Sequence, residues 1–424
     1  MTSHVLSVNS AGIVRTLRNQ FTRSTAFLPE ALQNARRAGA TTVRVLWDER
    51  SRVMRITDDG NGISDFEALF TLGRSGWDAE VIAEENPFGV GFMSAVLASS
   101  HVTIRSGDCQ ASFDTRTLLN FEPIEVTPIS GRNLSGTELI LTLHHAVTPP
   151  TGPAELCRTG PDHWHHLLCK IAAGFPVPVY FNDKLIPRPL VIDSDFITTE
   201  VGQVWLDGYA LCQPFNLNRL PRLYYQGLPV VDPNGGRSES PDILHLDQQR
   251  FRLRMPDRDT LIDAHEQRVV IHDVLEAVWR KRLIERRSEL TPQDFVDFHW
   301  TLCNQLKLPE LLRDMPLCAS MISRYSASLD LIDDGDAELK RWSDAPLPGK
   351  DAVFIERVDD HYSAVQGDRP SPLASVYALE RSLPVLDARV PDTHWARRRI
   401  VDILDRELGL SYDITGSRKS GEFQ

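Results

Sequence analysis

Glu30 and Asn34 are the first residues in this sequence whose types and spacing could do chemistry together. They lie in a stretch whose apolar residues recur at helical spacing, namely Leu28, Ala31, Leu32 and Ala35. A separation of four residues places both side chains on one helix face, one turn apart. The amide oxygen is a hard ligand suited to Mg²⁺, and the carboxylate can orient and deprotonate a water molecule. In isolation, the pair is more typical of a solvated polar helix face.

A second segment, Asp58-Asp59-Gly60-Asn61-Gly62-Ile63, directly follows a predicted strand. A carboxylate at a strand end can accept a hydrogen bond from a purine amino group. Gly60 and Gly62 would let the backbone pass close to a flat base. Asp-Gly and Asn-Gly are also ordinary turn pairs, so this segment alone favours a simple turn.

A third segment, Phe88-Gly89-Val90-Gly91-Phe92, precedes a predicted helix rich in small residues. Glycines before a helix expose unpaired N–H groups at its positive end, which is a physical anion site. The segment is not a Walker loop, because no Gly-Lys-Ser/Thr follows, and it lacks the full GxGxxG pattern of dinucleotide folds. A plain glycine turn is the alternative.

The elements that must position these residues can be predicted from the same stretch of chain. We expect a helix over 27–37, a hairpin formed by 43–47 and 52–57, a helix over 92–99, and strands at 101–105 and 137–143. A Pro-rich segment at 148–153 marks a first boundary. Beyond it we expect strands at 177–181, 202–206 and 223–231, and helices at 261–287, from Thr291-Pro292, and at 395–408.

Together with Ser135-Gly136-Thr137, the three segments resemble the four ATP-site motifs of the GHKL superfamily, which contains gyrase, the ninety-kilodalton chaperones, histidine kinases and MutL. The segment 88–95 is most similar to ninety-kilodalton heat-shock chaperones of the HtpG type, as is Arg74-Ser75-Gly76.

This resemblance implies an ATPase that depends on ATP and Mg²⁺. Glu30 would be the general base for water attack, and Asn34 would be the Mg²⁺ ligand. Asp58 would accept the adenine amino group, helped by the hydroxyl of Thr137. The other nucleotide-binding residues would shape the base pocket or present amides to the phosphates: Gly60, Gly62, Ser75, Gly89, Val90, Gly91 and Phe92. Residues 71–87 would form a lid.

A cation that reaches the terminal phosphate has two candidates. Arg258 lies in a segment, 254–261, that resembles the chaperone middle-domain loop whose arginine reaches the γ-phosphate. Such a group would stabilise charge on the transferred phosphoryl. A surface Arg-Asp pair is an equal alternative for Arg258. Lys184, beside the predicted Asn182-Asp183 turn, is the other candidate.

The fold class expected from these patterns is α+β. It comprises an N-terminal Bergerat-type α/β sandwich ATPase domain (1–147), a second α/β middle domain with the phosphate-sensing loop (154–290), and a mainly helical C-terminal region of unassigned role (291–424).

A group of cysteines and histidines raises the question of a zinc site: Cys157, His163, His165, His166 and Cys169. His165 and Cys169 have helical spacing that suits a metal, but the other spacings match no usual zinc pattern. We favour a structural helix with a buried stripe at Trp164, Leu167 and Leu168, and leave metal binding open.

Composition restricts the classes of function. The sequence has a formal net charge of -12, with 42% hydrophobic and 25% charged residues, which fits a globular protein and disfavours broad binding to a nucleic-acid backbone. There is no long apolar run, no signal-peptide order at the start and no CxxC pair among six cysteines. We therefore expect a cytoplasmic protein with reduced thiols and no membrane association.

The first functional hypothesis is a chaperone-like ATPase whose domains close on ATP and act on client or partner proteins, with a homodimer left open. One alternative is a DNA-processing ATPase of the MutL or topoisomerase B-subunit type, against which the acidic charge counts. A histidine kinase is disfavoured, because no phospho-acceptor helix precedes the ATP motifs. A module that binds ATP without hydrolysing it is the remaining alternative.

Overall fold

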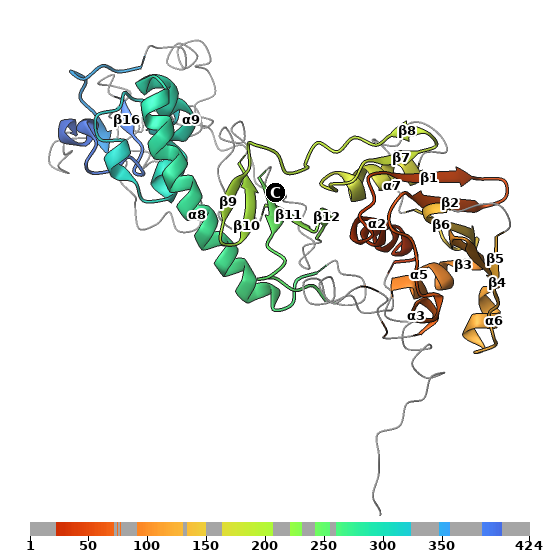
Figure 1. Ribbon diagram of the computed structural model, residues 1–424. Coiled ribbons are helices and arrows are strands. Elements are labelled where there is room, and N and C mark those ends of the chain that lie inside the picture. The colour runs from red at the N-terminus through yellow and green to blue at the C-terminus, as the bar shows by residue number, and fades with distance from the viewer. Residues whose placement is uncertain are drawn as a thin grey trace, which may run out of the picture. The chain divides into compact units, whose positions relative to one another are not determined.

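The computed structural model describes residues 23–71, 74, 77, 91–129, 134–149, 163–206, 221–230, 242–254, 260–323, 347–356 and 384–400. These residues form two compact units, one holding 23–206 and 221–274 and the other holding 275–400. Each unit is described by itself (Figure 1). The division into three domains at 1–147, 154–290 and 291–424 stays a prediction.

The first unit begins with an eight-stranded sheet. Its strands are β1 (Val43–Asp48), β2 (Val53–Asp58), β3 (Ser99–Gly107), β4 (Cys109–Asp114), β5 (Val126–Pro128), β6 (Leu134–Leu143), β7 (Val179–Phe181) and β8 (Lys184–Leu185). Their order across the sheet is β5-β4-β3-β6-β2-β1-β7-β8. The predicted hairpin is confirmed, with Val43 opposite Asp58. Because β7 pairs in parallel with β1, the sheet continues past the Pro-rich segment at 148–153.

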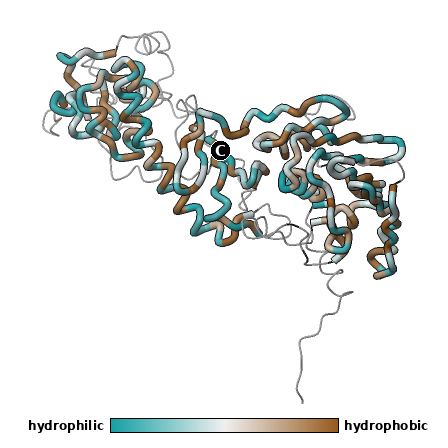
Figure 2. Tube along the Cα trace, in the orientation of Figure 1, coloured by the Kyte–Doolittle hydropathy of each residue, from teal (hydrophilic) through white to brown (hydrophobic). Residues whose placement is uncertain are grey.

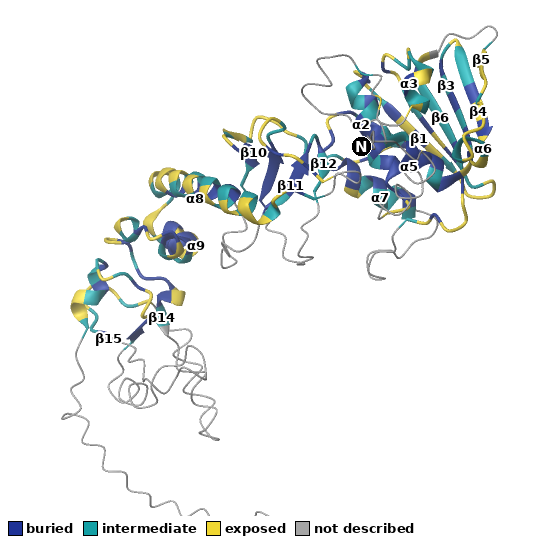
Figure 3. Cartoon of the chain, turned by 90° about the horizontal axis from the view of Figure 1, so that it is seen from below, coloured by how far each residue is buried: buried dark blue, intermediate teal, exposed yellow. Residues whose placement is uncertain are grey.

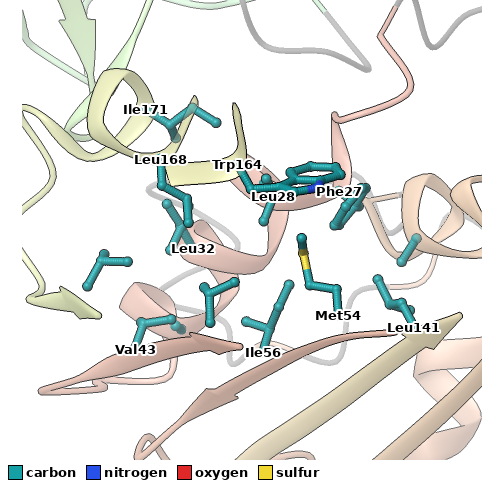
Figure 4. Packing of buried hydrophobic residues seen from close by; sticks show 14 of the residues in the cluster. Phe27, Leu28, Leu32, Val43, Met54, Ile56, Leu141, Trp164, Leu168 and Ile171 are labelled. Atoms are coloured by element: carbon teal, nitrogen blue, oxygen red, sulfur yellow. The ribbon is translucent and has the colours of Figure 1, made fainter. Parts of the chain in front are cut away.

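The helices around this sheet are α2 (Phe27–Arg37), α3 (Phe66–Phe70), α5 (Gly91–Ala98), α6 (Thr115–Leu119) and α7 (His163–Ala172). The predicted helix at 27–37 is confirmed, and α5 begins one residue before the predicted helix at 92–99. Side chains of α2 and α7 point toward those of the strands (Figure 4). The Trp164 ring lies 6.2 Å from the Phe27 ring and 5.5 Å from the Trp47 ring.

Alternation along the strands explains which sheet face is covered. Val43 and Val45 in β1 are buried, whereas Arg44 between them is exposed. The same alternation holds in β2, where Met54 and Ile56 flank the exposed Arg55. A period of two directs alternate side chains to opposite faces, so the apolar set meets the helices. Burying each such side chain stabilises the fold by about 1.5–3 kcal/mol.

The first unit also contains a five-stranded sheet. Its strands are β9 (Ile197–Thr199), β10 (Gly202–Trp205), β11 (Arg222–Tyr225), β12 (Leu228–Pro229) and β13 (Ile243–Leu246), in the order β12-β11-β13-β10-β9. All four residues of β13 are buried, as the central position of this strand requires. Much of β10 and β11 is also buried (Figure 3). Strands were predicted at 202–206 and 223–231, and the second of these contains β11, a turn and β12.

Two helices follow, α8 (Ala264–Glu289) and α9 (Pro292–Gln305). Hydrophilic and hydrophobic residues alternate along α8 (Figure 2). Its buried residues recur every four positions, at Ile271, Leu275, Trp279 and Leu283. The start of α9 is confirmed, because the Thr291 hydroxyl oxygen accepts the Asp294 backbone N–H at 3.2 Å and Pro292 follows it.

The described part of 291–424 is less helical than expected. Besides α9 it contains the short 3₁₀ helices η2 (Pro309–Leu311), η3 (Ala319–Met321) and η6 (Trp395–Arg399), and a three-stranded sheet. The sheet has the order β14-β16-β15, from β14 (Ile322–Ser323), β15 (Ile355–Glu356) and β16 (Val385–Leu386). The helix predicted at 395–408 is not one continuous α-helix: 395–399 form η6, and Ile400 is extended (φ -73°, ψ 135°) and bridges to Phe354. Residues 401–408 lie outside the described residues.

Among the described helices, none has the length and apolar character needed to span a bilayer.

Candidate nucleotide-binding site

Helix α2 carries two of the predicted site residues. Glu30 is buried in its first turn, with 9% of its surface exposed, and Asn34 is half-buried one turn later. The Glu30 carboxyl group faces the start of α5. A Cβ atom placed on Gly91 would lie 3.1 Å from Glu30 Cδ and closer still to Oε2. The structure therefore brings the predicted base and the last glycine of the predicted phosphate loop together.

Asp58 ends strand β2 with its side chain largely withdrawn from solvent. Its Oδ1 accepts the Gly60 backbone N–H at 2.9 Å, and the Thr137 backbone N–H lies close enough to lower the pKa of the carboxyl group. Burial raises the pKa of Asp58 above its ordinary value, the two backbone donors oppose this shift, and the Asp59 charge adds a smaller rise. The site thus holds a carboxyl group with remaining acceptor capacity beside Gly136-Thr137 in β6.

Two glycines permit the close approach of the chain segments around Asp58. Gly136 has φ 83° and Gly62 has φ 75°, a region that favours glycine. A Cβ on Gly136 would overlap the backbone carbonyl of Asp58 and lie 2.9 Å from Asp59 Cα. This part of β6 can approach Asp58 so closely only because Gly136 has no side chain.

Gly60 and Asp59 have a different task, which is to join the 58–63 segment to the end of α2. A Cβ on Gly60 would lie 2.7 Å from both Cβ and the carbonyl oxygen of Ala38. The Asp59 carboxylate accepts the backbone N–H groups of Thr41 at 2.7 Å and Thr42 at 2.9 Å. The two neighbouring aspartates are therefore used differently, with Asp59 fixing the entry to β1 and Asp58 facing the site.

Some of the predicted residues have no structural description. Ser75, Gly89, Val90 and Arg258 lie outside the described residues, as does most of the predicted lid. Phe92 is described and half-buried, and its ring meets the Phe70 ring edge-on at 6.1 Å. Its side chain therefore packs toward α3, so any phosphate contact at this position would come from the backbone N–H.

The sequence motifs missed two buried polar residues next to the site. The Ser106 hydroxyl lies between the Gly62-Ile63 and Gly136-Thr137 segments.

The second residue is Gln33 in α2, which is 2% exposed. Its Nε2 donates to Gln226 Oε1 at 3.1 Å, and its Oε1 accepts from Arg36 Nε at 2.8 Å. Gln226-Gly227 forms the turn between β11 and β12, with φ 54° and 81°. Turn-forming residues in the sequence could have predicted the Gln226-Gly227 turn, but they could not have predicted its contact with Gln33 in α2.

The other candidate groups lie elsewhere. Lys184 is exposed on the edge strand β8. Strands β1 and β7 separate it from Asp58 in β2, and this position counts against a role at the terminal phosphate.

In α7, Trp164 and Leu168 are buried and Leu167 is half-buried, as a structural helix requires. No group of three or more His, Cys, Asp or Glu residues in the described part of the chain could hold a metal ion, and Cys157 lies outside that part.

One family model matches the part of the chain that contains most of these residues. Residues 22–125 match the family model described as "Histidine kinase-, DNA gyrase B-, and HSP90-like ATPase". The matched segment contains Glu30, Asn34, Asp58 and Gly91, and it supports a GHKL-type ATPase domain in this part of the chain. A search of curated proteins found no match.

Proposed function

We propose that this protein binds ATP with Mg²⁺ between α2, the end of β2 and the start of α5, and hydrolyses it. The observation that carries the proposal is the placement of two carboxyl groups. Glu30 faces the first residue of α5, and Asp58 lies beside Gly136-Thr137 of β6, all within or next to the segment matched to a GHKL ATPase model.

Asp58 and its surroundings suit an adenine ring. The adenine amino group would donate to the Asp58 carboxylate, whose Oδ1 also accepts the fixed backbone N–H of Gly60. The hydroxyl of Thr137 in β6 would add a polar contact. A guanine ring carries a carbonyl where adenine has the amino group. Its oxygen would face the Asp58 carboxylate, and two acceptors cannot form a hydrogen bond with each other. This arrangement favours ATP over GTP.

Glu30 suits the role of general base. It would hold a water molecule, and would accept its proton as the water oxygen bonds to the γ-phosphorus. The bond from that phosphorus to the β–γ bridging oxygen breaks, which leaves ADP and inorganic phosphate. The Asn34 amide oxygen, one turn from Glu30, fits the hard-oxygen preference of Mg²⁺, and this ion would neutralise phosphate charge when bound.

The finer role that we propose is a chaperone-like ATPase that acts on protein partners. It is supported by the similarity of 88–95 to the ninety-kilodalton chaperones, and by the acidic charge, which disfavours the DNA-processing alternative. Arg258 would reach the γ-phosphate in a closed state, and this assignment stays a prediction. Stimulation of turnover by duplex DNA would favour the MutL-like alternative instead.

Two substitutions test the proposed function. Glu30→Gln removes the base but keeps the size of the side chain, so ATP affinity should stay within about twofold while hydrolysis falls by about 10² to 10⁴. Asp58→Asn should lower ATP affinity by at least about tenfold, because it loses a charged acceptor. The exposed Glu67→Gln on α3 is the matched control. A parent protein that binds no ATP, or a Glu30→Gln protein with the parental rate, would contradict the proposal.

A further inference from the structure

Ser106 joins two backbone segments that border Asp58. Its side chain is buried, with 2% of the residue exposed. The hydroxyl oxygen accepts the Ile63 backbone N–H at 2.7 Å, and the hydroxyl proton is donated to the Gly136 carbonyl oxygen at 2.9 Å. One segment runs on from Asp58, and the other passes so close to it that a Cβ on Gly136 would overlap the Asp58 carbonyl group. A single hydroxyl therefore links both.

The position of Ser106 in β3 is unusual for a serine. Val102 and Ile104 precede it at alternate positions and are buried, so the strand period directs Ser106 toward the same covered face. Burying a hydroxyl costs free energy unless it is hydrogen-bonded, and this one has both of its bonds. The pairing of β3 with β6 also shifts register between Ser106 and Gly107, and such bulges redirect side chains near functional sites.

Gly62 lies directly against the Ser106 hydroxyl. A Cβ on Gly62 would lie 2.5 Å from Ser106 Oγ and 3.1 Å from the Gly136 carbonyl oxygen. The hydroxyl thus fills the space that the missing side chain leaves. Moving or removing the hydroxyl would free the Gly62-Ile63 and Gly136-Thr137 segments to move relative to each other.

We propose that Ser106 is a positioning residue that sets the geometry of the base pocket, and so fixes how strongly Asp58 recognises the adenine amino group. This inference rests on the proposed ATP site. Ser106 would not touch the nucleotide. It would act by holding Thr137, and with it the Asp58 carboxyl group, in register with the base.

The test compares two triphosphates that differ only at the amino group, ATP and purine riboside triphosphate, by equilibrium binding. In Ser106→Ala, ATP and ADP affinities should fall by an equal factor of about tenfold, as expected for the loss of two hydrogen bonds. Affinity for purine riboside triphosphate should fall by much less, because it lacks the amino group, so the discrimination between the two triphosphates should shrink. Ser106→Cys keeps the volume with a weak S–H donor, and it should show the same trend if the alanine variant folds poorly.

The matched control is Ser99→Ala at the other end of β3. Ser99 is fully buried, and its hydroxyl donates to the Ala95 carbonyl oxygen at 2.6 Å, so its loss reports general loosening of the strand. It should leave the discrimination between the triphosphates at the parental value. Parental discrimination in both Ser106 variants, or an equal loss in Ser99→Ala, would overturn the role of Ser106. A parent protein that binds neither ATP nor ADP would overturn the proposed function itself.

Discussion

The carboxyl group of Glu30 occupies the space that a side chain on Gly91 would need. A Cβ there would lie 3.1 Å from Glu30 Cδ, and the nearest atom would be a carboxylate oxygen. This oxygen is the far end of a flexible side chain, so it can turn away without disturbing the backbone. The first residue of α5 therefore controls where the proposed base points.

Gly91→Ala should lower ATP hydrolysis by at least about tenfold, with little loss of stability. The added methyl group would displace the Glu30 carboxylate from its place, and a base out of position loses most of its contribution of about 10² to 10⁴ in rate. Single-turnover hydrolysis and thermal unfolding measure the two effects. Gly349→Ala, where a Cβ would meet nothing within 4 Å, is the control. Equal turnover in the two variants would show that Glu30 is not the base.

Asp58→Asn should stabilise the fold at neutral pH while it weakens ATP binding. Burial raises the pKa of Asp58, so the folded protein holds that proton more tightly than the unfolded chain does. The free energy of unfolding therefore falls as pH rises from about 3.8 through the raised pKa, and the penalty persists above it. Thermal unfolding at pH 7 should show a higher Tm for the variant, and the difference should shrink near pH 4.

The adjacent Asp59→Asn gives the opposite sign and serves as the comparison. Burial works against ionisation of Asp59 too, but hydrogen bonds from Thr41 and Thr42 outweigh it and lower the pKa. Ionised Asp59 thus stabilises the fold above its ordinary pKa, and that stabilisation is lost as pH falls below it. Asp59→Asn should therefore lower Tm at pH 7. Two variants that shift Tm in the same direction would contradict the separate roles of these aspartates.

The individual elements of the site could be predicted from the sequence because the patterns that indicate them extend over only a few residues. Helical spacing around Glu30, alternation around Val43 and Met54, and glycines at 60, 62, 89 and 91 each depend on neighbours within a few residues. The contact between Gly91 and Glu30, and the hydroxyl bridge of Ser106, join segments far apart in the chain. No pattern in either segment specifies its partner, so the sequence could not predict them.

The second half of the chain shows where periodicity misleads. Along α8 the sequence repeats apolar residues on one side at Val270, Val274, Val278 and Leu283, but only Leu283 is buried and the three valines are half-buried. The other buried residues lie one position after the valines, at Ile271, Leu275 and Trp279. Both rows have the same spacing of four, and packing partners decide between them. The sheet β14-β16-β15 was missed because its strands contain two residues each, too few to show alternation.

Acid should destabilise the second unit through His299 in α9. This residue is 1% exposed, and burial together with the charges of Arg286 and Arg282 lowers its pKa from 6.5 to about 4. The unfolded chain therefore binds more protons between these values, so the free energy of unfolding falls as pH drops through about 6.5 to 4. Urea unfolding of His299→Phe should show a smaller decrease over this range than the parent.

Gln33 and Gln226 should prove energetically coupled although they are 193 residues apart, because their amide groups share a hydrogen bond of 3.1 Å in a mostly buried place. In a double-mutant cycle of Gln33→Ala and Gln226→Asn, unfolding in urea should give a coupling free energy of about 0.5–1.5 kcal/mol. Asparagine is chosen at 226 because it tolerates φ 54° while its shorter side chain cannot reach Gln33.

The control cycle pairs Gln33→Ala with Gln248→Ala. The Gln248 Oε1 accepts from Gln226 at 3.2 Å, so this residue is one hydrogen bond further from Gln33. Its coupling should be smaller. If the first cycle is additive within error, the hydrogen bond between α2 and the β11–β12 turn does not contribute to stability in solution.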